Sequence, residues 1–146
     1  MQNFLRISEA VSLAFHTMGL LASRKHEVLR TSDIAKTLEA SEHHLQKIHN
    51  RLAKTGFIQA VRGPKGGFRL DRPAHEITLL AIFQAIEGPL DPCACMLGRP
   101  SCQMDDCILG DLVDRVNSLV REHLEKSTIE QLTQIKPKSR QEPHTP

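Results

Sequence analysis

All four cysteines of this 146-residue chain lie in one segment, residues 91–107. Three of them, Cys95, Cys102 and Cys107, are separated by six and then four residues, and the segment also contains glycine and proline, which favour a loop. A loop of this length can bring three thiolates onto one metal centre, and thiolate is the ligand that zinc and iron–sulfur clusters prefer. The pattern therefore predicts a metal or cluster site, with Cys93 as an extra thiol.

Disulfide bonds or structural thiols are the alternative interpretation of these cysteines. The N-terminal sequence MQNFLRISEAV lacks the basic start and unbroken apolar run of a secretory signal, so we expect a cytoplasmic protein. In a reducing cytoplasm, clustered cysteines more often bind metal or do redox chemistry than form disulfides. No apolar run approaches the roughly 20 residues that span a bilayer, so we expect no membrane partner.

Length and composition indicate one domain, or one small domain with an appended element. Hydrophobic residues make up 40% of the chain, but the aromatic residues are five Phe with no Tyr or Trp, so we expect an aliphatic core. The net charge is only +2, which makes the distribution of charge more informative than its total.

The spacing of apolar residues predicts one helix over residues 5–23 and two short helices within residues 31–54. The expected N-caps are Ser8 for the first helix, Thr31 or Ser32 for the second and Ser41 for the third. Gly56 follows as a helix stop. Two short helices joined tightly are typical of a helix-turn-helix.

A β-hairpin is expected directly after the third helix. Residues 57–61 are apolar and β-branched, RGPKGG is a dense turn signal, and residues 68–70 form a second short strand. Helix, turn, helix and hairpin together predict a winged helix. A further amphipathic helix is expected over residues 76–87.

Charge in this region favours nucleic-acid binding. From His43 to Leu70 the chain has no Asp or Glu, although it holds 17 acidic residues in total. A basic helix face and a basic, glycine-rich hairpin tip suit phosphate contact. An ordinary solvated face, or a winged helix that binds protein, is the alternative. The candidate DNA-binding residues are His43, His44, Gln46, Lys47, Arg51, Arg62, Lys65 and Gly66.

After the cysteine loop, a long helix is predicted from about Cys107 to Lys126, capped by Asp105 or Asp106. Its apolar stripe suggests packing on a second subunit, and palindromic DNA sites also require two-fold symmetry. Packing on the first helix of the same chain is the alternative. The expected fold is mainly α with a small hairpin wing. Its parts are a winged helix-turn-helix domain (1–88), a cluster loop (89–107), a dimerisation helix (107–130) and a disordered tail (131–146).

This order of parts resembles the IscR/NsrR (Rrf-two) family of bacterial transcriptional regulators. The resemblance covers nearly everything up to about residue 130. It depends on the segment from Thr31 to Leu70, above all VRGPKGGFRL, on AIEG at residues 85–88, on the three loop cysteines and on the long helix after Cys107.

The resemblance implies a dimeric winged-helix regulator with its recognition helix in the major groove and its wing in the adjacent minor groove. By position, Cys95, Cys102 and Cys107 would hold a [2Fe–2S] or [4Fe–4S] cluster near the dimer interface. The residues facing DNA would be Lys47, Arg51, Arg62 and Lys65, with Gln46 and His43 as candidates for the base edges.

The fourth ligand of such a cluster stays open. The cysteine spacing of six and four departs from the usual five and five, and residues 108–110 contain no histidine that could serve. The resemblance implies Glu9, at the start of the first helix and contributed by the partner subunit, and the extra Cys93 of this chain is the alternative. A carboxylate is a weak, displaceable ligand that suits a sensor, and Glu9 is the preferred candidate. Its position in a first helical turn would equally be explained by the helix dipole.

The sequence therefore predicts a DNA-binding transcriptional repressor, a homodimer on a palindromic operator, whose affinity is controlled by an iron–sulfur cluster that senses redox state, nitric oxide or iron supply. Two alternatives stay open. The same fold could use zinc or free thiols as its sensor. A small thiol redox or electron-transfer protein would need an activated thiol, usually in Cys-x-x-Cys, whereas this chain has Cys-x-Cys. No nucleophile–base pair is found, so no enzyme is predicted.

Overall fold

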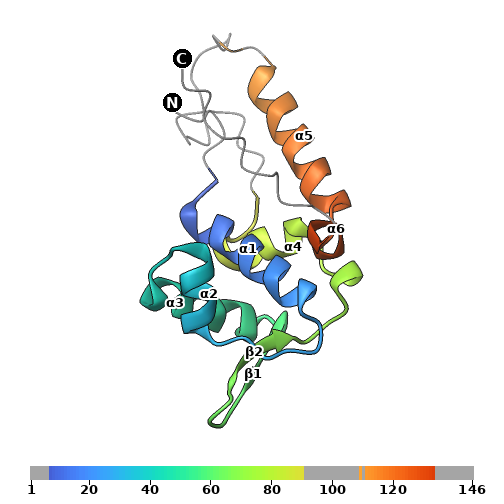
Figure 1. Cartoon of the computed structure of the whole chain (residues 1–146). Coiled ribbons are helices and arrows are strands. Elements are labelled where there is room, and N and C mark those ends of the chain that lie inside the picture. Colours follow the sequence, from blue (N-terminus) through green and yellow to red (C-terminus); the bar gives the residue numbers. More distant parts are fainter. Residues whose placement is uncertain (1–6, 91–108, 110, 134–146) are drawn as a thin grey trace, which may run out of the picture.

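A computed structural model describes residues 7–90, 109 and 111–133 of the chain (Figure 1). The elements are α1 (Glu9–Ser23), α2 (Thr31–Leu38), α3 (Glu42–Lys54), β1 (Ile58–Val61), β2 (Gly67–Leu70), η1 (Ala74–Glu76), α4 (Leu79–Glu87), α5 (Leu112–Lys126) and α6 (Ile129–Thr133). The fold is mainly helical with one two-stranded hairpin, which confirms the predicted class. Figure 1 shows the hairpin projecting at the end of the molecule away from α5.

The helix caps agree with the sequence prediction in two cases and differ in the third. The Oγ of Ser8 accepts from the backbone N–H of Val11 at 3.2 Å, and Ser41 caps α3 in the same way. Helix α2 instead begins after Arg30, which makes no side-chain cap bond. The prediction of a cap at Thr31 or Ser32 was therefore wrong, because the Thr31 hydroxyl is buried and bonded to the side chains of α3.

The wing is an antiparallel hairpin in which Ile58 pairs with Leu70 and Val61 pairs with Gly67. Leu29, outside the two strands, also pairs with β2 in an antiparallel bridge. Its N–H donates to the Phe68 carbonyl at 3.0 Å, and its carbonyl accepts from the Phe68 N–H at 2.8 Å. The chain before α2 is thus connected to the wing, so the two cannot move independently without breaking these bonds.

Helix α4 begins later than residue 76, where the sequence pattern placed its start. Residues 74–76 form the short 3₁₀ helix η1, and α4 begins at Leu79 with Thr78 as its N-cap. The cause is a tertiary pairing. The Leu79 N–H donates to the Ser127 carbonyl and the Ile129 N–H donates to the Ile77 carbonyl, each at 2.9 Å, which keeps this stretch extended.

Helix α5 ends at Lys126 as predicted, but it begins at Leu112, with Leu109 and Asp111 in turns before it. The proposed caps Asp105 and Asp106 lie outside the described residues. The short helix α6 was not predicted, and it packs on α1 and η1. Among residues 7–90 and 111–133, no helix is long and apolar enough to cross a bilayer.

The core is aliphatic, as the composition suggested, and α1 lies at its centre, in contact with α2, α3, α4, α6 and β2. The most deeply buried apolar side chains are Val11, Met18, Leu21, Ile34, Leu45, Leu52, Ile58, Ile77, Ile82 and Ile129. The same cluster includes Phe68 of β2, Ala74 of η1 and Leu124 of α5, so the helix-turn-helix, the wing and the C-terminal helices share one hydrophobic core.

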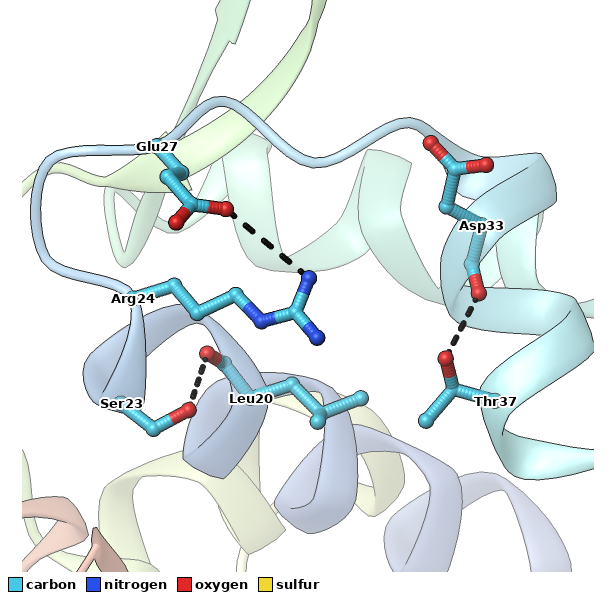
Figure 2. A network of polar contacts seen from close by, with 6 residues as sticks. All are labelled: Leu20, Ser23, Arg24, Glu27, Asp33 and Thr37. Carbon is cyan, nitrogen blue, oxygen red and sulfur yellow. Dashed lines mark hydrogen bonds and ion pairs between the residues drawn. The ribbon is translucent and has the colours of Figure 1, made fainter.

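Local polar contacts lie on the outer surface where α1 ends beside α2 (Figure 2). The Ser23 hydroxyl donates to a backbone carbonyl one turn earlier at 2.8 Å, and the Thr37 hydroxyl donates to the Asp33 carbonyl at 2.9 Å. Arg24 pairs with Glu27 at 3.8 Å, but both side chains are at least half exposed, so this ion pair adds little stability. Apolar packing beneath these contacts holds the two helices together.

One titratable side chain is fully buried in this core. His49, on the inner face of α3, has no exposed surface, and its ring lies 4.9 Å from that of Phe68, measured between centroids. Burial lowers the pKa of His49 from 6.5 to about 4, so the imidazole is neutral at pH 7.

We expect the stability of the fold to fall as the pH drops from 6.5 towards 4. In this window the unfolded chain binds a proton at His49 that the folded chain excludes, and the expected loss is about 2 kcal/mol between pH 7 and 4.5. Urea unfolding at the two pH values measures it. In His49→Gln this loss of unfolding free energy at low pH should vanish, whereas His75→Gln, at an exposed histidine, should retain it. An equal pH dependence in all three proteins would contradict the assignment.

Candidate nucleic-acid interface

Helix α3 has a buried face and an outer face, in the pattern of a 3.6-residue period. Leu45, Ile48, His49 and Leu52 are buried against α1 and the hairpin. The outer face carries polar and basic side chains, all exposed: His43, Gln46, Lys47, Asn50 and Lys54. Three of the eight predicted DNA-binding residues, His43, Gln46 and Lys47, lie on this face; His44, also on α3, is half-buried.

The tip of the wing presents two exposed basic residues, Arg62 and Lys65, as expected from the sequence. Its turn closes through a bond from the Gly66 N–H to the Gly63 carbonyl at 2.9 Å. A Cβ at Gly66 would lie 2.4 Å from the carbonyl oxygen of Val61, which no larger residue tolerates. Gly66 therefore allows the tight turn that carries the two basic side chains.

Arg30 fixes the wing relative to the helix-turn-helix, and this contact was not predicted. Its guanidinium donates to the Pro64 carbonyl at 2.8 Å, so the residue before α2 holds the tip of the hairpin. Together with the pairing of Leu29 and Phe68, this bond sets the position of the wing beside α3. The only hint of this contact in the sequence was that Arg30 lies between two predicted helices and not within one of them.

Arg51 differs from the other predicted contacts. Its guanidinium donates to the Ile86 carbonyl at 2.6 Å, at the C-terminal end of α4. The C-terminal carbonyls of a helix lack intrahelical partners and attract cations. Arg51 is thus exposed like Lys47, but its guanidinium also forms a bond between α3 and α4.

The electrostatic character of this surface follows from the same residues. Between His43 and Leu70 there is no carboxylate, and the exposed ion pairs of the described part of the chain lie elsewhere, on α5, at the end of α1 and beside η1. The basic side chains of α3 and the wing are therefore available for a polyanion.

Comparison with known proteins agrees with this architecture. A family model described as Rrf2, an iron-dependent transcriptional regulator, matches residues 7–135. The chain belongs to the Rrf2 family. Family membership makes it a transcriptional regulator and implies DNA binding; its relatives are regulators, not enzymes.

Individual relatives support the same assignment. The chain is 30% identical to protein aau3 of Rhizobium meliloti over 135 residues, covering 91% of this chain and 88% of that protein. It is 31% identical to the regulator IscR of Pectobacterium atrosepticum over 106 residues, covering 72% of this chain and 64% of that regulator.

Solved structures share the fold. CymR, the global cysteine regulator of B. subtilis, superposes with a TM-score of 0.75 at 26% identity, covering 92% of this chain and all of that one. The oxidised form of Staphylococcus aureus CymR gives a TM-score of 0.73 at 26% identity, covering 91% and 99% of the two chains. IscR of T. potens gives 0.72 at 23% identity, covering 91% and 90%.

The predicted cluster ligands of this Rrf2 chain are only partly within the described residues. Cys93, Cys95, Cys102 and Cys107 lie outside them, and among the residues that are described no group of three or more His, Cys, Asp and Glu side chains could hold a metal ion. Glu9 is described: it is the first residue of α1 and is exposed.

The residues that precede the cysteine segment are bonded to three helices of the Rrf2 fold. Glu87 accepts a hydrogen bond from the Ser8 hydroxyl at the start of α1. Arg51 of α3 donates to the Ile86 carbonyl, and Arg121 of α5 donates to the Leu90 carbonyl. The chain entering the cysteine segment is therefore connected to α1, α3 and α5.

Proposed function

We propose that this regulator binds operator DNA with the outer face of α3 in the major groove and the wing in the adjacent minor groove. The observation that carries the proposal is the basic, carboxylate-free surface from His43 to Leu70, which the fold presents on α3 and on the hairpin held beside it by Arg30. Lys47, Arg62 and Lys65 would contact phosphates, and Gln46 and His43 would reach base edges.

We propose further that the protein binds a palindromic operator as a homodimer. The apolar stripe of α5 supports this, because Leu112 and Leu119 are 43% and 67% exposed within one chain, while Leu124 at the other end of the helix is buried. Figure 1 shows most of α5 extending beyond the other helices. Exposed leucines at helical spacing on such an extension favour a second copy of the same helix.

The sensor in this proposal is an iron–sulfur cluster held by Cys95, Cys102 and Cys107, with Glu9 of the partner subunit or Cys93 as fourth ligand. Three thiolates form a donor set that suits such a cluster, and the matching family is described as iron-dependent. The exposure of Glu9 leaves its carboxylate accessible to a partner. When bound, a cluster would supply iron and sulfide that react with oxidants or nitric oxide and depend on iron supply.

Residues of the described chain would carry that response to DNA. Ile86, Glu87 and Leu90 lie just before the cysteine segment and are bonded to Arg51, Ser8 and Arg121. A displacement of this stretch would act on α3 through Arg51 and on α5 through Arg121. The two recognition helices of a dimer must match one DNA turn, roughly 34 Å, so a small change in their spacing alters operator affinity.

A second candidate keeps the fold and the DNA surface but uses zinc or free thiols at the same cysteines. The likeness to CymR favours it, since one of the matching structures is an oxidised form. Thiolate chemistry would then replace cluster chemistry at Cys95, Cys102 and Cys107.

Lys65→Ala should weaken binding to random-sequence duplex DNA and reduce the slope of log affinity against log salt by about one unit, because one phosphate contact is lost. Arg115→Ala is the matched control: it removes the same charge from an exposed side chain of α5, outside α3 and the wing, so the slope should stay unchanged. Fluorescence anisotropy over a salt series measures both. An unchanged slope in Lys65→Ala would remove Lys65 from the interface.

Leu119→Glu should convert the dimer to a monomer at micromolar concentration, because the exchange places a charge in a buried apolar contact. Sedimentation velocity measures the mass. Ser118→Glu adds the same charge to the neighbouring exposed position, off the leucine stripe, and should leave the dimer intact. A wild-type monomer, or a Leu119→Glu dimer, would be incompatible with assembly through α5.

Anaerobically purified protein should show broad absorbance between about 320 and 460 nm, with matched iron and sulfide contents. Cys102→Ala should lose both. Cys93→Ala should keep them if Glu9 is the fourth ligand and lose them if Cys93 is. A colourless protein that stays colourless after reconstitution with iron and sulfide would exclude the cluster, and zinc and thiol analysis would then identify the second candidate.

A further inference from the structure

Three buried polar side chains from three helices meet beneath the outer face of α3. Thr17 of α1 and His49 of α3 have no exposed surface, and Thr31 of α2 is 8% exposed. The His49 Nδ1 lies 3.1 Å from the Thr31 hydroxyl, and its Nε2 lies 3.5 Å from the Thr17 hydroxyl. The imidazole therefore bridges the first helix and the second within the apolar core.

The bridge extends to the surface through Thr31. Its hydroxyl donates to the Oε1 of Gln46 at 3.2 Å, and the Nε2 of Gln46 donates to the Oδ1 of Asn50 at 3.0 Å. Gln46 and Asn50 are exposed and lie one turn apart on α3. A continuous chain of hydrogen bonds thus connects α1 to the surface that would face the bases. We call these five residues the relay.

The direction of each bond in the relay follows from the number of protons available. A threonine hydroxyl has one proton, and that of Thr31 goes to Gln46. Toward His49 the Thr31 oxygen must therefore accept, which places the imidazole proton on Nδ1. Nε2 then has a lone pair, and the Thr17 hydroxyl donates to it. The low pKa of His49 keeps the ring neutral, as this arrangement requires.

The opposite tautomer would reverse every bond. With the proton on Nε2, His49 would donate to Thr17 and accept from Thr31, and the Gln46 amide would have to turn over. Gln46 would then accept from Asn50 rather than donate to it. The tautomer of the buried imidazole thus determines which group of Asn50 is available to a partner. A proton on Nδ1 leaves the amide N–H donors of Asn50 available, and a proton on Nε2 leaves its Oδ1 acceptor available.

We propose that Thr31, His49 and Thr17 are specificity-determining positioning residues, which fix the hydrogen-bonding edge that Gln46 and Asn50 present to a base pair. The inference depends on the proposed role of α3 in the major groove. In the arrangement described here, the Asn50 amide N–H groups are left to donate. The matching base edge offers acceptors, and guanine, with N7 and O6, is the best fit.

Selection from a random-sequence duplex pool by the full-length wild-type protein tests the proposal. Asn50→Ala identifies the operator position that Asn50 reads, which we expect to be guanine. Thr31→Val has the same shape but no hydroxyl, and it should lose about tenfold of the discrimination at that same position, with the remaining positions and the salt slope unchanged. Thr31→Ser should restore the preference. Thr37→Val, on the exposed side of α2, should match the wild type.

The imidazole itself supplies a second measurement that requires no variant. The ¹⁵N shifts of His49 in the folded wild-type protein distinguish the two tautomers, and we expect the proton on Nδ1. A proton on Nε2 would overturn the relay as described, even if Thr31→Val failed to fold.

The outcomes separate this inference from the function on which it depends. If the wild type selects no sequence at all, operator binding through α3 is wrong, and the inference falls with it. If the wild type selects a sequence and Thr31→Val selects the same one with equal discrimination, operator binding stands and the positioning role of Thr31 is overturned.

Discussion

An imidazole on the buried face of α3 imposes hydrogen-bonding requirements on the elements around it. His49 is fully buried beside Phe68, where an unsatisfied nitrogen would cost on the order of 1–3 kcal/mol. Both nitrogens find partners, but only because Thr17 and Thr31 come from different helices. The packing of α1 and α2 on α3 is therefore specified by polar contacts as well as by apolar area. A purely aliphatic core would allow these helices to slide more easily.

The stretch from Ile86 to Leu90 is the second point on which the arrangement depends. The carbonyls at the end of α4 need partners, and Arg51 of α3 supplies one for Ile86. A cation at a helix C-terminus is also favoured by the helix dipole. Three residues beyond the helix, the Leu90 carbonyl accepts from Arg121 of α5. These two bonds connect α3 and α5 to the chain that leads into the cysteine segment.

Local signals in the sequence were sufficient for much of this fold, and tertiary contacts account for the errors. Apolar periodicity located α1 and α3, and Ser8 and Ser41 cap them as predicted. The start of α4 was misplaced because Ile77–Leu79 pairs with a strand-like segment some 50 residues later. Thr31 was read as a cap, although its hydroxyl bonds His49 and Gln46. The sequence shows which residues are polar, but it does not show which partner a polar side chain bonds.

Arg51 shows why a basic window is an incomplete guide to a DNA surface. By sequence it is equivalent to Lys47, since both are cations on α3 in a region without carboxylates. They differ by four positions, which places them about 40° apart on the helix, and α4 lies close enough to bond the longer, forked side chain. The surface available to DNA is therefore smaller than the basic window. Arg51 instead connects α3 to the stretch before the cysteines. In the proposed function, phosphate binding and signal transmission would therefore be separate tasks of neighbouring residues.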